Sequence, residues 1–434
     1  MRTIEKTQER FHPLLKETIY YDKISPGLDT YVFPRKGYQK KYAVYAVNYG
    51  SIDTRYRNRS GKIVKLPQGT AHFLEHKMFE QKDRNVFDEF SKKGASANAF
   101  TSFGHTAYLF SATENFYECL NTLLDFVNEP YFTKESVEKE QGIISQEIRM
   151  YQDNPDWKVF FNMLEGIYHN HPVNINIAGT EEEIGTITPE LLYDCHKTFY
   201  HPSNMVLFII GDLDVAEVFS EVDKNLSAKN LSPSSDLDHR TLPSEPESVF
   251  MSQKTDEHDI SKPRAYIGFK DQVTKQTETP SLKDEIVTDF LLELIFGKGS
   301  KIYQSLLEEG LIDNQFEFSY SHGEGFGFSL IGGPTKDPDK LIHKLEKGIE
   351  TTFEEGIDKR DFQRIKNKLL GDYIQGFNSL EYLANTFLNL YFSDAFLFDY
   401  SEILNQISID ELHNRLANHL YTENKTKSLL YPSN

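Results

Sequence analysis

The sequence contains two cysteines, one tryptophan and no long apolar run. With only Cys119 and Cys195 available, a disulfide framework is not expected, and we interpret both as small buried hydrophobic residues. The charged start, MRTIEKTQERFHPLLKE, lacks the apolar core of a secretion signal. The longest apolar run, residues 205–210, is the length of a strand, whereas a membrane helix needs about 20 residues. We therefore expect a cytoplasmic protein with no membrane partner.

Basic residues are also scarce relative to acidic ones, 47 against 66, which gives a formal charge of −19. A chain with this charge repels phosphate backbones and anionic lipids, so nucleic acid is not expected as a partner. We interpret the charge first as a solvated acidic surface and second as an attraction for cationic peptides. The 434 residues are too many for a single hydrophobic core, which predicts two domains or two fused halves.

A segment rich in proline, serine and aspartate divides the chain nearly in half. Its sequence, SAKNLSPSSDLDHRTLPSEPES, has the composition of a solvated connector. We therefore predict an N-terminal half over residues 1–228, a linker over 229–257 and a C-terminal half over 258–434.

The two halves repeat one another. ITPELLYDCHKTFYHPSN begins at Ile187, and the similar ISIDELHNRLANHLYTEN begins at Ile407, 220 residues later. The same offset aligns NAFTSFGHTAYLF with FSYSHGEGFGFSL, and both read as β-hairpins. An offset of 218 aligns residues 72–79, HFLEHKMF, with residues 290–297, FLLELIFG. An internal duplication explains offsets this constant.

Each half is predicted to combine runs of strands with runs of helices, which is the α+β class. In the first half we expect a strand over residues 41–51, a helix over about 71–81, the hairpin, a helix from 133 or 134 to 152, and a strand from 205. Thr188 followed by Pro189 is typical of a helix N-cap with proline in the first turn.

The pentapeptide His72-Phe73-Leu74-Glu75-His76 carries the most specific chemistry. On a helix, positions i, i+3 and i+4 share one face, so His72, Glu75 and His76 point the same way. Two imidazoles one turn apart can both reach one zinc ion, and a neighbouring carboxylate can act as a general base. This order is one of the known zinc-peptidase motifs.

The alternative is a surface helix that carries two of the 14 histidines by coincidence. The duplication argues against it. In the second half, Phe290 and Leu294 occupy the positions of His72 and His76, so the fold accepts apolar side chains there. Two histidines in the first half therefore indicate a metal site.

A catalytic zinc site usually has three protein ligands, so a further ligand is expected. Glu140 and Glu147 lie seven residues apart in KEQGIISQEIRMYQ, on one face of the predicted helix. From the residues alone either could bind the metal, and an exposed, salt-bridged helix face is an equal alternative.

These motifs together resemble the M16 metallopeptidases, which include pitrilysin, insulin-degrading enzyme and the mitochondrial processing peptidase. The resemblance is carried by HFLEH, by Glu140 and Glu147, by GASANAFT (residues 94–101) and by YHPSNMVL (residues 200–207). It implies two duplicated α/β-roll halves that close around a chamber, usually through dimerisation. The segments HKMFE, NAFTS and MYQDNPDW further resemble a short bacterial branch linked to 5-aminopentanol modification of elongation factor P.

The resemblance implies a role for each matching residue. His72, His76 and Glu147 would bind one zinc ion per chain, Glu75 would be the catalytic base, and Glu140 would support the site from behind the ligands.

The resemblance also implies how substrate is held. Asn98, Ala99 and Thr101 would lie on a strand that accepts an extended peptide. Relatives bring a substrate-binding Arg and Tyr from the second half, within a stretch like LREKRGLAY. Here the stretch reads SLLEEGLID, which places Leu306 and Asp313 where those residues would be.

We therefore predict a zinc-dependent endopeptidase that cleaves peptides or unfolded segments. The missing Arg and Tyr predict a heterodimer with a metal-less M16-like paralogue that supplies them, and otherwise a homodimer. The alternatives are a non-catalytic scaffold or binding subunit, and an accessory factor in the modification of a translation factor.

Overall fold

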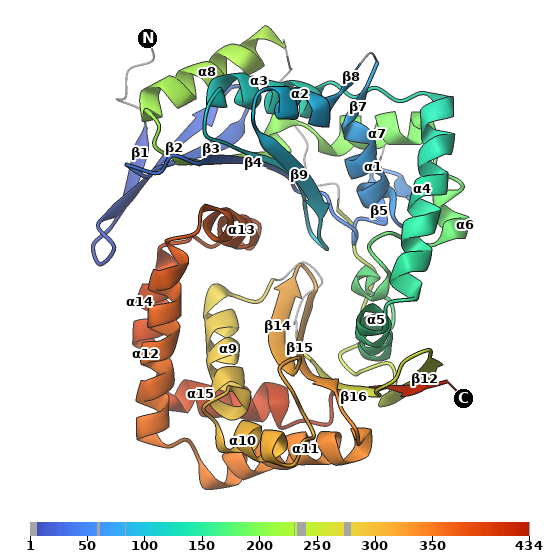
Figure 1. Cartoon of the computed structure of the whole chain (residues 1–434), viewed down its shortest axis with the longest axis vertical. Helices are drawn as coiled ribbons and strands as arrows, with labels where there is room; N and C mark the ends of the chain where they lie inside the picture. Colours follow the sequence, from blue (N-terminus) through green and yellow to red (C-terminus); the bar gives the residue numbers. More distant parts are fainter. Residues whose placement is uncertain are drawn as a thin grey trace. The chain divides into compact units, whose positions relative to one another are not determined.

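The structure is a computed structural model that describes residues 7–58, 61–82, 84–229, 231, 240–272 and 279–433. It contains two compact units. The first comprises Met1–Ile148, Asn176–Thr241 and Gly376–Phe392, and the second comprises Arg149–Ile175, Leu242–Gln375 and Ser393–Asn434. Each unit is built on one mixed sheet covered by helices (Figure 1). The predicted α+β class with two M16-type halves is therefore confirmed.

Along the chain, several strands in succession are followed by several helices in succession. The helices are α1 (Thr70–Met78), α2 (Val86–Lys92), α3 (Phe116–Asn128), α4 (Lys134–Gln152), α5 (Pro155–Ile167), α6 (Glu181–Ile184), α7 (Pro189–Phe199), α8 (Val215–Ala228), α9 (Leu282–Phe296), α10 (Lys301–Glu308), α11 (Pro338–Glu355), α12 (Lys359–Gly376), α13 (Leu380–Tyr391), α14 (Asp399–Gln406) and α15 (Ile409–Arg415). The described residues also form two 3-10 turns, Pro172–Asn174 and Pro202–Asn204, and a π-helical turn, Leu416–Leu420.

The first unit has a seven-stranded sheet in the order β1-β2-β3-β11-β4-β10-β9. Its strands are β1 (Gln8–His12), β2 (Glu17–Ile24), β3 (Leu28–Pro34), β4 (Lys41–Val47), β9 (Ser96–Thr101), β10 (Thr106–Ala112) and β11 (Met205–Gly211). Every residue of the apolar strand β11 is buried. This strand pairs parallel with β3 and antiparallel with β4, which makes it the centre of the core.

The second unit has a five-stranded sheet in the order β12-β16-β13-β15-β14. Its strands are β12 (Gln253–His258), β13 (Arg264–Lys270), β14 (Glu317–Gly323), β15 (Phe326–Pro334) and β16 (Lys425–Pro432). Two short ribbons belong to the first unit: β5 (Arg55–Arg57) with β6 (Ile63–Lys65), and β7 (Glu80–Gln81) with β8 (Arg84–Asn85).

The strand order supports the predicted duplication. Strands β3-β11-β4-β10-β9 of the first sheet correspond in order and direction to β12-β16-β13-β15-β14 of the second, including the single parallel pair. Strands β11 and β16 begin at Met205 and Lys425, 220 residues apart. The N-caps Thr188 of α7 and Ser408 of α15 keep the same spacing.

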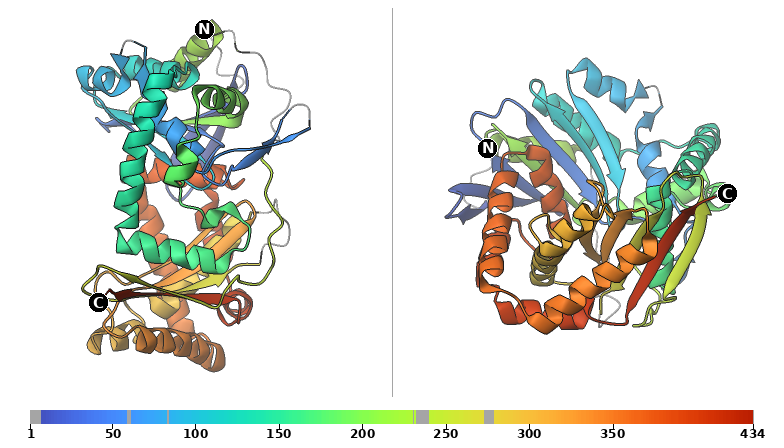
Figure 2. Two further views of the ribbon diagram at one scale, coloured as in Figure 1. Left: turned by 90° about the vertical axis from the view of Figure 1, so that its right-hand side faces the viewer. Right: turned by 60° about the horizontal axis from the view of Figure 1, so that its bottom comes forward.

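One helix in each unit comes from the other half of the sequence. Helix α5, from the first half, packs on β13 and β16 of the second sheet, and the left-hand view of Figure 2 shows it lying against these strands. Helix α13, from the second half, packs on β4 and β11 of the first sheet. Gly268 on β13 permits this packing, because a Cβ there would lie 2.6 Å from Cγ of Met163 on α5.

Local sequence signals predicted most elements correctly. Helix α4 spans Lys134–Gln152, and the Thr188 side chain accepts a hydrogen bond from the backbone N–H of Leu191. Helix α1 ends at Met78, three residues before the predicted end, and the chain then enters β7. Both cysteines are buried and free, as expected. In the described part of the chain, no helix is long and apolar enough to cross a membrane.

The described part of the predicted linker is mostly exposed or half-buried, but ion pairs anchor it at two points; residues 230 and 232–239 lie outside the described residues. In the first unit, the Arg240 guanidinium pairs with the buried carboxylate of Asp53, with Nε to Oδ1 at 2.6 Å. In the second unit, Lys270 Nζ lies 2.6 Å from Glu245 Oε1. Glu245 also accepts backbone N–H groups from residues 169–171. Composition alone did not indicate these anchors.

The Glu245–Lys270 pair provides a test of this anchoring. Glu245→Ala leaves the Lys270 ammonium, whose side chain is 4% exposed, without its carboxylate partner. Removing one partner of a buried pair costs about 3–5 kcal/mol, so the free energy of unfolding should fall by this order in denaturant titrations. Glu247→Ala, on the exposed side of the same segment, should change it by less than about 0.5 kcal/mol. Equal effects of the two substitutions would contradict the anchoring.

Candidate metal site

Helix α1 begins where two backbone segments approach too closely for any side chain. Gly69, the N-cap, has a left-handed φ of 81°, and a Cβ there would lie 2.3 Å from the Ala178 carbonyl oxygen. A Cβ on Gly179 would lie 2.4 Å from the Gln68 carbonyl oxygen. The Gln68 N–H also donates to the Glu183 carboxylate at 3.2 Å. The segment 178–183 therefore fixes the position from which α1 starts.

The three polar side chains of the pentapeptide lie together on α1, as the helical spacing predicted. The ring centroids of His72 and His76 are 4.5 Å apart. His72 and Glu75 are buried, whereas His76 is the one residue of α1 that is only half-buried. Phe73 and Leu74 are fully buried and attach the helix to the core. The apolar residues thus hold the helix while the polar face stays available.

Helix α4 brings Glu147 to both histidines. Glu147 Oε1 lies 3.7 Å from His72 Nε2, and Glu147 Oε2 lies 3.6 Å from His76 Nε2. One ligand atom from each of the three residues can be chosen so that all lie within 4.8 Å of one another. Ligands about 2.0–2.1 Å from a tetrahedral zinc ion are separated by about 3.4 Å, so these three groups fit such an ion with little movement.

Glu140 lies one layer behind the ligands. Its Oε1 is 3.1 Å from His76 Nδ1, and because a carboxylate only accepts, the imidazole carries its proton on Nδ1. This leaves Nε2 of His76 free to bind a metal, and it fixes the ring orientation. The geometry therefore favours Glu147 at the metal and Glu140 in support, which the residues alone had left open.

The electrostatics of these side chains suit cation binding. Burial, followed by the neighbouring His76, lowers the pKa of His72 to about 4, so this imidazole is neutral at pH 7, as a metal ligand must be. Burial also lowers the pKa of His76, but the hydrogen bond to Glu140 and three nearby carboxylates outweigh it, and the net pKa is raised. Burial raises the pKa of Glu75, and a hydrogen bond from Thr101 partly opposes this.

The strand predicted to receive substrate, β9, is the last strand of its sheet, and α1 packs beside it. Asn98 is exposed, and its Oδ1 accepts the Ala99 N–H at 2.9 Å. Thr101 has a contact that the sequence did not indicate: its hydroxyl donates to Glu75 Oε2 at 2.8 Å. No local pattern signals this bond, because it joins a strand to a helix 26 residues away.

The matching position in the second unit holds no pair of histidines. Phe290, the counterpart of His72, is fully buried and stacks on Phe362 of α12 with centroids 5.1 Å apart. Glu293, the counterpart of Glu75, lies 3.5 Å from the Lys368 ammonium, also on α12. An aromatic pair and a lysine ion pair therefore occupy a place where the first unit collects metal ligands.

The structure also shows the two positions at which the M16 resemblance would place a substrate-binding Arg and Tyr. Leu306 is fully buried in α10, and the Asp313 carboxylate pairs with Lys262 at 2.7 Å. Neither side chain can replace a guanidinium or a phenol that binds a peptide.

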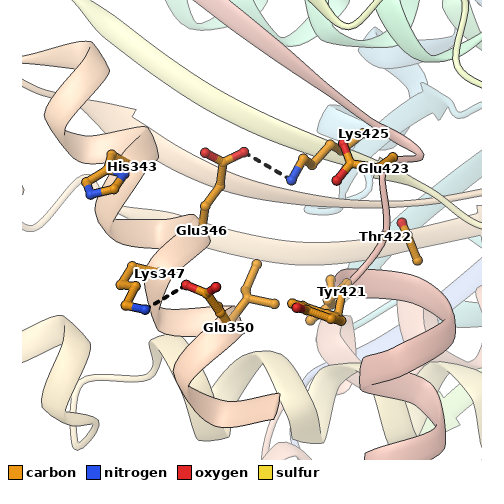
Figure 3. A pocket seen from close by; sticks show the side chains of 10 residues that line it. His343, Glu346, Lys347, Glu350, Tyr421, Thr422, Glu423 and Lys425 are labelled. Carbon is orange, nitrogen blue, oxygen red and sulfur yellow. Dashed lines mark hydrogen bonds and ion pairs between the residues drawn. The ribbon is translucent and has the colours of Figure 1, made fainter. Parts of the chain in front are cut away.

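A separate hollow of about 420 Å³ lies in the second unit, between α11 and residues 420–425 (Figure 3). Its charged side chains largely neutralise one another. Glu346 pairs with Lys425 at 3.1 Å, and Glu350 pairs with Lys347 at 2.7 Å. This hollow shows no arrangement that would bind a metal or activate a nucleophile, so the candidate site is the one on α1 and α4.

A duplicated α+β fold with two histidines and a glutamate around one point defines the class of the metallopeptidases with the HxxEH motif. Two family models match the chain: "Insulinase (Peptidase family M16)" over residues 65–181, which contain the candidate site, and "Peptidase M16 inactive domain" over residues 186–369. The zinc protease YmfH of Bacillus subtilis (strain 168) is 44% identical over 96% of this chain and 97% of its own length. The chain belongs to peptidase family M16.

Solved structures agree with this assignment. An M16-like peptidase from Alicyclobacillus acidocaldarius has a TM-score of 0.91 and 34% identity, covering 98% of this chain and 99% of that one. A protease from Helicobacter pylori shares the fold with a TM-score of 0.82, at 19% identity and with 95% and 99% covered. The resemblance drawn from the motifs is thus confirmed at the level of the family.

The close approach at the start of α1 makes a testable prediction. Gly179→Ala places a methyl group on the Gln68 carbonyl, which should displace α1 and weaken zinc binding measured by competitive chelation. Gly37→Ala is the matched control, because Gly37 also has a left-handed backbone, with φ 83°, but open space around it. In both variants, alanine in a left-handed backbone conformation should lower the free energy of unfolding by about 1–2 kcal/mol. The clash should cost Gly179→Ala about 1–3 kcal/mol more. Equal stability and zinc affinity of the two variants would refute the role of the segment 178–183 in fixing the start of α1.

Proposed function

We propose that this chain is a zinc-dependent endopeptidase that cleaves peptides or unfolded segments. The observation that carries the proposal is the convergence of His72, His76 and Glu147, with Glu75 on the same helical face. The donor set of two imidazoles and one carboxylate is typical of a catalytic zinc site, in which three protein ligands leave a position for water. When bound there, zinc would acidify water and polarise the scissile carbonyl.

The residues of the chain supply the remaining functions. Glu75 accepts a proton from the attacking water and later donates it to the leaving amine. Burial raises the pKa of the Glu75 carboxyl toward neutral pH. A group whose pKa lies nearer the working pH can act first as base and then as acid. Glu140 keeps His76 oriented through the 3.1 Å contact. The free edge of β9, with Asn98 and Ala99, supplies backbone groups that an extended peptide can pair with.

The roles of the base and the metal ligands can be separated by substitution. Glu75→Gln should keep stoichiometric zinc but reduce peptide turnover by about 10²–10⁴-fold, because the amide cannot accept the proton. His76→Ala should lose zinc itself, as measured by elemental analysis after dialysis. Glu138→Gln, on the exposed side of α4, is the control and should change neither quantity. Turnover retained by Glu75→Gln would remove Glu75 from the role of base. A full complement of zinc without any cleavage in the native protein would favour the scaffold or binding alternative.

We further propose that the active form is a heterodimer in which this chain brings the metal. Support comes from Leu306 and Asp313, which stand where relatives carry the substrate-binding Arg and Tyr. A metal-less M16-like paralogue would bring these two residues, and a homodimer is the remaining arrangement.

The partner can be tested by purification from the native host, with mass determination by light scattering. The single chain should cleave peptides at least about tenfold more slowly than its complex with the paralogue, because positioning of substrate contributes this much or more. Full activity of a monomer would contradict the proposal.

Membership in the branch linked to 5-aminopentanol modification of elongation factor P stays a prediction. The mass of elongation factor P from a strain lacking this chain would decide it.

A further inference from the structure

Thr101 links the predicted substrate strand, β9, to the proposed catalytic base, Glu75. It is the last residue of β9, and its Oγ1 donates to Glu75 Oε2 at 2.8 Å. Glu75 is buried, and within the described residues this hydroxyl is the side-chain hydrogen-bond donor to its carboxylate. Within the described residues, no hydrogen bond is made to the second carboxylate oxygen, Oε1. The two oxygens of Glu75 are therefore not equivalent.

The Thr101 hydroxyl has one proton, and the surroundings direct it to Glu75. The neighbouring hydroxyl of Thr106 is occupied by the Tyr49 carbonyl at 2.9 Å and lies 3.5 Å from Thr101 Oγ1, too far for a good hydrogen bond. The side chain of Thr101 is also β-branched, which leaves it few rotamers. A rigid donor thus faces the base from the end of the strand.

We propose that Thr101 is a positioning residue for Glu75: it holds Oε2 and so leaves Oε1 to accept the proton from water. This inference rests on the proposed function. The terminal torsion of a glutamate is otherwise broad, and a base that rotates spends much of its time in the wrong orientation. Fixing one oxygen removes that freedom without neutralising the carboxylate.

The same residue joins substrate binding to the base. In the sheet Thr101 pairs with Thr106 of β10, and within the described part of the chain no strand pairs with the other edge of β9. A peptide that adds to this edge would lie against the backbone of the strand whose last side chain holds Glu75. A shift of β9 would therefore move the base, and misplacement by about 1 Å can cost on the order of 10²-fold in rate.

Thr101→Val tests this inference, because valine has the same shape and lacks the hydroxyl. In the zinc-loaded full chain, together with its partner if the partner is needed for activity, kcat should fall by about 10–100-fold while KM stays within about threefold. Thr101→Ser, which restores the donor, should recover most of the loss. Thr30→Val is the matched control: it makes the same change on β3 of the same sheet, at a buried hydroxyl that has no hydrogen-bond partner among the described residues.

Two further readouts separate a positioning role from a structural one. Zinc content of Thr101→Val should equal that of Thr30→Val, and a crystal structure of Thr101→Val should show the Glu75 carboxylate rotated or in two orientations. The inference is overturned if kcat equals that of the control, if only KM changes, if zinc is lost, or if Glu75 keeps a single unchanged orientation. Full turnover by Glu75→Gln would instead defeat the proposed function, whereas an inactive Glu75→Gln with a fully active Thr101→Val would defeat this inference alone.

Discussion

The candidate site depends on one geometric requirement: two imidazoles on one helix must meet a carboxylate from another at separations of 3.6–3.7 Å. This requirement fixes where α1 begins and how far α4 extends. Gly69 and Gly179 set the start of α1 by an approach that excludes any side chain. The length of α4 places Glu140 and Glu147 two turns apart on one face, so that one carboxylate can reach both histidines while the other orients His76.

The second unit shows what the same scaffold does without this requirement. Strand order and direction are preserved, but Phe290 packs on Phe362 and Glu293 pairs with Lys368. A stacked pair and an ion pair thus link the helix that corresponds to α1 with the one that corresponds to α4. The second unit forms the same strand arrangement without histidines at these positions. Burying two imidazoles and three carboxylates close together is costly unless something compensates the charge, and a divalent cation does so.

Much of this could be predicted from the sequence, because the signals were local or repeated. Helical spacing predicted the shared face of His72, Glu75 and His76, and constant offsets predicted two equivalent sheets. Helical spacing could not choose between Glu140 and Glu147, since both lie on one face; the family resemblance assigned Glu147 to the metal, and among physical observations only the tertiary packing of α4 distinguishes them. The bond from Thr101 to Glu75 and the burial of Glu245 against Lys270 were missed for the same reason, because each joins residues distant in sequence. Composition suggested a solvated linker where a few charged residues anchor it.

The exchange of α5 and α13 has a consequence for how this chain must be made. Each sheet takes one of its covering helices from the opposite half of the polypeptide, so neither core is complete until both halves have been synthesised. When only the first half has emerged from the ribosome, its sheet still lacks α13, and the faces of β4 and β11 on which α13 packs are uncovered. A cut at the linker would therefore separate each sheet from one of its covering helices, so the two sequence halves do not coincide with the two compact units.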